Sequence, residues 1–361
     1  MSRDKTIDRL RGFAMLWVIV VHVLYWGSFF DNETINRFKS FCLFEMPLFF
    51  FVTGASNSFS KTNGYVNFVY RRYKRVLIPY WVFAIICAGL SIVKYSFSGN
   101  MDISNGIKIV LSWLIPIDKQ MTSIPYLTWA LWFIPVYMCV ILVIPMFKRM
   151  KQSQERVRFL FLLLIVFVCT CLCKMGWIQN VTFYSLWTYI GLFYPELKTG
   201  IENKKRRTLF LAITVIGSAS LVVIYFSGAT INMQSNKFPP NITFLIFSMV
   251  MMSLLILIMP LLDRTIENCE KCRFLGKIIV LFSTRSMTIF LYQVFAFNIS
   301  IRVVDLLFSG ASIVLSIFQA LLCFVLTLPL CSGLALIFGE IENWGSSRKG
   351  PSVLSDKCAG R

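Results

Sequence analysis

The sequence predicts an all-α integral membrane protein, a polytopic helical bundle of about ten transmembrane helices with both termini in the cytoplasm. Three observations carry this prediction: the apolar composition, the spacing of apolar stretches along the chain, and the positions of the basic residues. Hydrophobic residues make up 57% of the 361 residues, charged residues make up 15%, and the mean hydropathy is +0.69. A soluble domain of this length would not have that composition.

Apolar stretches long enough to cross a bilayer follow one another along the whole chain, and we expect one helix in each. In order they cover residues 12–30, 41–57, 77–96, 126–147, 157–174, 181–197, 208–226, 242–262, 278–300 and 310–339. Residues 107–117 are also apolar but too short to span, so we expect an interfacial helix on the outer face. The last stretch contains Pro329 and is either one long tilted helix or a helix broken at the proline.

The basic residues fix the expected orientation. The net charge is +19, and 28 of the 36 Lys and Arg residues fall in segments that are cytoplasmic if the N-terminus is inside. This is the asymmetry of the positive-inside rule, and it favours an even number of helices with both termini inside. We expect the protein to lie in the cell inner (plasma) membrane. The basic residues form short clusters and no continuous stripe, so a nucleic-acid partner is not expected. We expect residues 1–345 to form a single transmembrane domain and residues 346–361 a short cytoplasmic tail.

The eleven cysteines give no disulfide framework, because most are scattered through apolar segments where a thiol packs as a small hydrophobe. Cys269 and Cys272 form a lone CxxC with no second pair and no histidine nearby. No metal site is predicted.

One titratable residue stands out within the first apolar stretch. His22 is the only histidine in the chain, and it lies eleven residues after Arg11. On a helix that separation is roughly 16 Å, which places the ring near the middle of the hydrocarbon core. Such a ring is either held by hydrogen bonds from a neighbouring helix or lines a substrate or proton path.

Two further clusters carry unusual residues. In the second stretch, Pro47 removes a backbone donor, Gly54 permits close helix approach, and Glu45 places a carboxyl group near the outer end. At the cytoplasmic start of the third helix, Arg72 and Arg75 lie three residues apart, so they share one face and could together hold phosphate oxygens. The plainer interpretations are a kinked packing helix and a charge cluster that only fixes topology.

Taken together, these motifs resemble the acyltransferase-3 family of integral membrane acyltransferases, which O-acetylate carbohydrates. Arg11-x10-His22 is similar to the family's first-helix motif, Phe49-x4-Gly54 to its second, and Arg72-x-x-Arg75 to its third. Many relatives place a histidine near two positions where this chain has Glu45 and Gln293, so the implied chemistry depends on His22 alone.

The resemblance implies a membrane-embedded O-acyltransferase surrounded by membrane lipids. Acetyl-CoA would donate the acyl group, with its phosphates held by Arg11, Arg72 and Arg75. His22 would act as general base or as acyl relay, and Glu45 would orient the imidazole or bind a hydroxyl. The acceptor would be a carbohydrate or lipid-linked glycan of the cell envelope.

Two points stay open from the sequence. Trp129 and Trp132 either stack on a sugar ring or anchor a helix at the membrane interface. A second function class is a transporter or flippase that uses His22 as a proton relay, although the inverted repeats typical of many transporters are not visible.

Overall fold

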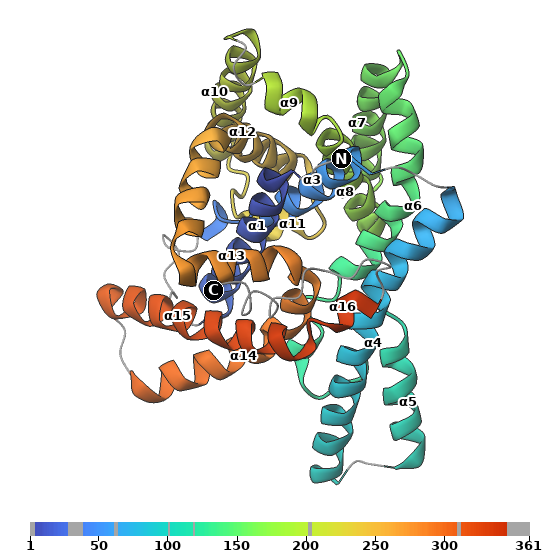
Figure 1. Cartoon of the computed structure of the whole chain (residues 1–361), viewed down its shortest axis with the longest axis vertical. Helices are drawn as coiled ribbons and strands as arrows, with labels where there is room; N and C mark the ends of the chain where they lie inside the picture. Colours follow the sequence, from blue (N-terminus) through green and yellow to red (C-terminus); the bar gives the residue numbers. More distant parts are fainter. Residues whose placement is uncertain are drawn as a thin grey trace, which may run out of the picture.

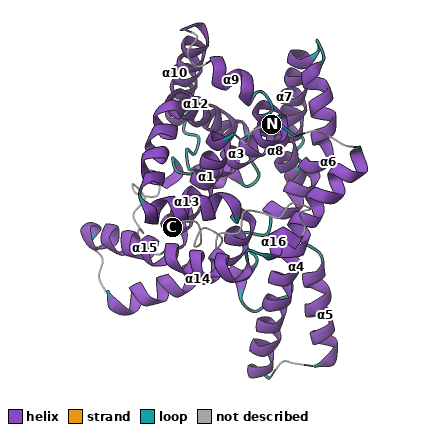
Figure 2. Ribbon diagram, in the orientation of Figure 1, coloured by secondary structure: helices purple, strands orange, loops and turns teal. Residues whose placement is uncertain are grey.

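The computed structural model describes residues 4–27, 39–60, 64–99, 102–117, 120–200, 204–308 and 312–344. Within these ranges the chain forms helices and loops and no named strand (Figure 2). The predicted cytoplasmic tail, residues 346–361, lies outside the described residues.

The described helices follow the order of the apolar stretches in the sequence. Their bounds are α1 Lys5–Trp26, α3 Glu45–Ser58, α4 Tyr65–Phe97, α5 Ile103–Leu114, the 3-10 turn η1 Pro125–Leu127, α6 Phe133–Gln152, α7 Arg156–Leu172, α8 Gly176–Gly191, α9 Tyr194–Gly200, α10 Lys204–Phe226, α11 Met233–Lys237, α12 Ile242–Lys271, α13 Arg273–Thr284, α14 Ser286–Leu307, α15 Ile313–Phe338 and α16 Ile341–Trp344.

The predicted all-α membrane architecture is confirmed. Each of the expected apolar stretches contains a helix, and among the described residues six helices are long and apolar enough to cross a membrane. These are α4, α6, α10, α12, α14 and α15. α15 runs through Pro329 without a break, which decides between the two expectations for the last stretch.

Two local expectations were wrong. The stretch 278–300 divides into α13 and α14 at Arg285, whose backbone leaves the helical region. The segment 107–117 does not lie apart as an interfacial helix, because α5 packs antiparallel along α4 (Figure 1). The hydroxyl of Tyr80 donates to the carbonyls of Trp113 and Ile115, which ties the end of α5 to α4.

Helix α1 lies at the centre of the molecule and contacts α3, α12, α13, α14 and α15 (Figure 1). Its N-terminal end is fixed by Arg9, which is 8% exposed. The Arg9 guanidinium lies 2.9 Å from Asp263 and 2.8 Å from Glu270, both on α12. The ion pairs hold the helix that carries Arg11 and His22.

Helices α3 and α8 approach closely where both have glycine. A Cβ on Gly54 would lie 2.0 Å from the Thr188 carbonyl oxygen, and one on Gly191 would lie 2.1 Å from the Phe51 oxygen. Only glycine permits this separation, which is the physical basis of the Phe49-x4-Gly54 motif.

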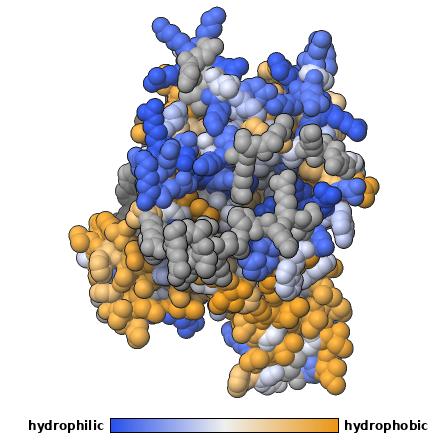
Figure 3. Space-filling view, viewed as in Figure 1, coloured by the Kyte–Doolittle hydropathy of each residue, from blue (hydrophilic) through white to orange (hydrophobic). Residues whose placement is uncertain are grey.

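The surface separates into polar and apolar regions, as expected for a chain that spans a membrane. Apolar residues cover the α4–α5 hairpin and the outer ends of α14 and α15, and hydrophilic residues gather around α9 and the start of α10 (Figure 3). Exposed apolar side chains such as Ile85, Phe97, Ile103 and Leu306 belong to the apolar regions. Lipid contact explains their exposure.

Candidate active site

A cavity of about 340 Å³ lies between α1, α3, α11 and the segment that precedes α6. It brings together four of the predicted site residues, which are His22, Glu45, Trp129 and Trp132. We call it the histidine cavity. Residues that are more than a hundred positions apart in the sequence therefore line one space.

The hydrogen bonds around His22 fix which nitrogen of the neutral ring carries the proton. The Gln293 side-chain amide donates through Nε2 to the Phe290 carbonyl at 3.0 Å, so its oxygen Oε1 faces the histidine. The Nδ1 atom of His22 lies 3.0 Å from this oxygen, which can only accept. In the neutral ring Nδ1 is therefore the donor, and Nε2 keeps a lone pair that can take a proton.

Aromatic side chains form the wall of the histidine cavity. The His22 and Trp129 rings meet edge to face with centroids 4.4 Å apart. Trp132 meets Phe238 edge to face at 4.9 Å. The two tryptophans thus line the histidine cavity, and the first of them packs directly on the imidazole.

Glu45 is the first residue of α3, where the helix dipole favours a carboxylate. It pairs with Lys237 at the end of α11, and the two side chains are 3% and 5% exposed respectively. The second carboxylate oxygen, Oε2, is buried and has no hydrogen-bond partner among the described residues. Glu45 lines the histidine cavity, and its carboxylate keeps one acceptor atom without a partner among the described residues.

A second, smaller cavity of about 70 Å³ brings together the three predicted donor-binding residues Arg11, Arg72 and Arg75. We call it the arginine cavity. The Arg11 guanidinium donates to Ser56 Oγ at 2.5 Å and to Asp8 at 3.2 Å. Arg72 donates to Asn57 Oδ1 at 2.8 Å. Two of the three guanidinium groups are thus held in place by side chains of α1 and α3.

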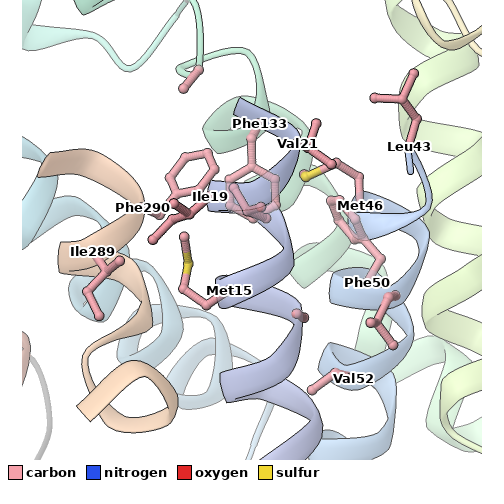
Figure 4. Packing of buried hydrophobic residues seen from close by; sticks show 14 of the residues in the cluster. Met15, Ile19, Val21, Leu43, Met46, Phe50, Val52, Phe133, Ile289 and Phe290 are labelled. Atoms are coloured by element: carbon pink, nitrogen blue, oxygen red, sulfur yellow. The ribbon is translucent and has the colours of Figure 1, made fainter. Parts of the chain in front are cut away.

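The two cavities are neighbours, separated by aromatic rings. Phe133 lines the arginine cavity and Phe290 lines the histidine cavity. Their ring centroids are 4.9 Å apart, and the two side chains lie together beside α1 (Figure 4).

The comparison with protein families shows which family the chain belongs to. The family model described as an acyltransferase domain matches residues 4–336, which is nearly the whole chain. The chain belongs to the acyltransferase-3 family. It is therefore a membrane acyltransferase, and the transporter alternative is set aside. Comparison with curated proteins and with solved structures gives no match.

The structure of this acyltransferase adds residues that sequence reasoning did not assign to the site. Lys237 belongs to none of the sequence motifs, yet it is buried against Glu45. Glu342 lines the arginine cavity from the C-terminal end of the described chain. Neither position has a local sequence signal, because each acquires its role only through contacts with distant helices.

Proposed function

We propose that this enzyme transfers an acetyl group from cytoplasmic acetyl-CoA to a hydroxyl of a cell-envelope carbohydrate, and that it does so in the plasma membrane. O-antigen, capsule, exopolysaccharide and related glycans are the acceptor classes. The observation that supports this most strongly is the adjacency of the two cavities. One carries three arginines, and the other carries an imidazole with an available Nε2.

The arginine cavity suits the phosphates of the donor. Arginine binds phosphate oxygens through several directed N–H donors, and a helix-borne pair such as Arg72 and Arg75 can hold one group from two sides. The cavity is large enough for phosphate oxygens and too small for a whole CoA molecule. The pantetheine arm would then extend between Phe133 and Phe290 and place the thioester beside His22.

In the general-base route, Nε2 of His22 takes the proton of the acceptor hydroxyl as its oxygen attacks the thioester carbonyl carbon. The carbon–sulfur bond breaks, and the imidazolium returns the proton to the CoA thiolate. In the acyl-relay route, Nε2 attacks the carbonyl carbon first, the carbon–sulfur bond breaks and the CoA thiolate leaves. The acceptor hydroxyl then attacks the acetyl-imidazolium, its proton passes to the thiolate, and the imidazole is released. Both routes need Gln293 to keep the proton on Nδ1.

Glu45 and the tryptophans serve the acceptor in this proposal. The carboxylate of Glu45, which lines the cavity, would accept a hydrogen bond from a sugar hydroxyl and so orient that hydroxyl toward the imidazole. Trp129 and Trp132 offer apolar walls against which a sugar ring can lie. A carbohydrate, with hydroxyls at its edge and C–H groups on its face, fits both features.

The proposal is tested by measuring transfer of radiolabelled acetyl from acetyl-CoA into the cell-envelope fraction of membranes that carry the enzyme. His22→Ala and the double variant Arg72→Ala/Arg75→Ala are expected to lose the transfer at equal expression. Arg71→Ala is the matched control, because Arg71 is an exposed neighbour on the same helix that does not line the cavity. Undiminished labelling with His22→Ala would contradict the proposal.

A further inference from the structure

The arginine cavity contains a carboxylate of the enzyme itself. Glu342 lies on the short helix α16, which packs against α4, the helix that carries Arg72 and Arg75 (Figure 1). The residue is 3% exposed and lines the cavity together with the three arginines. An internal anion therefore lies where the phosphates of the donor are expected to bind.

The position of Glu342 is fixed by its own contact with α14 and by contacts of the residues that precede it. Its Oε1 atom accepts from the Thr288 backbone N–H at 2.6 Å, which satisfies a free donor in the first turn of α14. The residues just before it are held by Arg285, which donates to the Gly339 carbonyl at 2.5 Å and pairs with Glu340. The chain thus holds the Glu342 carboxyl group in the cavity.

The other carboxylate oxygen of Glu342 is incompletely satisfied. Oε2 is buried and has no hydrogen-bond partner among the described residues. Burial raises the pKa of this carboxyl group, while the nearby guanidinium of Arg75 opposes that rise. Arg75 makes no ion pair within 4 Å with any described carboxylate. Carboxylate and guanidinium thus attract each other without forming a closed pair.

A phosphate in the same cavity would interact with both groups. It would be attracted by Arg11, Arg72 and Arg75 and repelled by an ionised Glu342. The repulsion acts on acetyl-CoA and on the CoA product alike, because the two share their phosphates. A group that weakens both equally changes affinity and product release rather than the barrier of the chemical step.

We propose that Glu342 is the affinity-limiting residue of the donor site, an internal carboxylate against which the donor phosphates compete for the arginine cavity. The inference rests on the proposed donor site. It assigns Glu342 no contact with the reacting atoms. Its role is to keep donor and product exchangeable in a site that three arginines would otherwise bind more tightly.

The test measures equilibrium binding of radiolabelled acetyl-CoA to the purified full-length enzyme. Glu342→Gln keeps an oxygen that accepts from Thr288 and removes only the charge, so the dissociation constant is expected to fall by about three- to tenfold. Asp305→Asn is the control, because it removes an exposed carboxylate on α14 that does not line the arginine cavity. Its dissociation constant should stay within about twofold of the wild-type value.

A merely structural role would give the opposite result, since a damaged cavity binds its ligand more weakly. An unchanged or higher dissociation constant with Glu342→Gln overturns the inference, and Glu342→Ala gives the same comparison if the glutamine variant does not accumulate. If the wild-type enzyme binds acetyl-CoA and Arg72→Ala/Arg75→Ala abolishes that binding, the donor site stands and only the role of Glu342 fails. If the double arginine variant binds as the wild type does, both fail.

Discussion

At the scale of single residues, the amide of Gln293 sets the protonation pattern of His22. Gln293→Leu removes the acceptor of the Nδ1 proton, so both tautomers become populated and the ring loses its orientation. We expect kcat for acetyl transfer to fall about ten- to hundredfold while donor affinity stays unchanged. Gln293→Glu retains an acceptor oxygen and should keep more activity. Equal losses in the two variants would contradict this role.

The buried pair of Glu45 and Lys237 makes a second prediction at this scale. Lys237→Met leaves a buried carboxylate without its cation and should lower the free energy of unfolding by about 3 kcal/mol or more. Adding Glu45→Gln removes that charge, so the double variant should regain part of the loss. Thermal unfolding in detergent compares the stability of the wild type, the single variant and the double variant. Strictly additive losses would show that the two residues are not coupled.

The site residues that the sequence predicts each belong to a motif within one helix. His22, Glu45 and the three arginines are predicted in this way, and the structure places them along two adjacent cavities. Lys237 and Glu342 were not found, because a lone charged residue near a helix end is indistinguishable from one that only fixes topology. Their burial depends on helices far away in the sequence.

At the scale of elements, the crossing of α3 and α8 depends on glycine. Gly54→Ala places a methyl group 2.0 Å from the backbone oxygen of Thr188, so the two helices must separate. We expect a loss of about 1–3 kcal/mol in stability, measured by thermal unfolding, together with reduced activity because α3 carries Glu45. Gly89→Ala is the control, since a methyl there meets nothing within 4 Å. Equal effects of the two would contradict the packing account.

The positions of the helices could be predicted from hydropathy. The breaks within apolar stretches and the packing of one helix on another could not. The stretch 278–300 contains four consecutive polar residues, 283–286, and the break at Arg285 falls within them. A short polar run inside an apolar stretch does not by itself show whether the helix continues or ends. That break is stabilised by contacts of Arg285 with Gly339 and Glu340, which are remote in sequence. Similarly, α5 is short enough to suggest a surface helix, and its position along α4 depends on the tertiary contacts of Tyr80.

At the scale of the whole molecule, the distribution of basic residues predicts which side of the membrane each loop faces. Cys173 and Cys272 are both exposed, and the predicted topology places the first at the outer end of α7 and the second among cytoplasmic basic residues. In single-cysteine variants, a membrane-impermeant maleimide should label Cys173 in intact cells and Cys272 only after permeabilisation. The reverse pattern would invert the assignment of both cavities.

The central claim is that donor binding and acyl transfer depend on different cavities of one enzyme. The measurement that tests it compares the dissociation constant for acetyl-CoA with the rate of acetyl transfer in His22→Ala and Arg75→Ala. His22→Ala should lose transfer while its dissociation constant stays at the wild-type value. Arg75→Ala should bind the donor about tenfold more weakly and recover transfer at saturating donor. Loss of donor binding in His22→Ala, or loss of transfer without weaker binding in Arg75→Ala, would contradict the account.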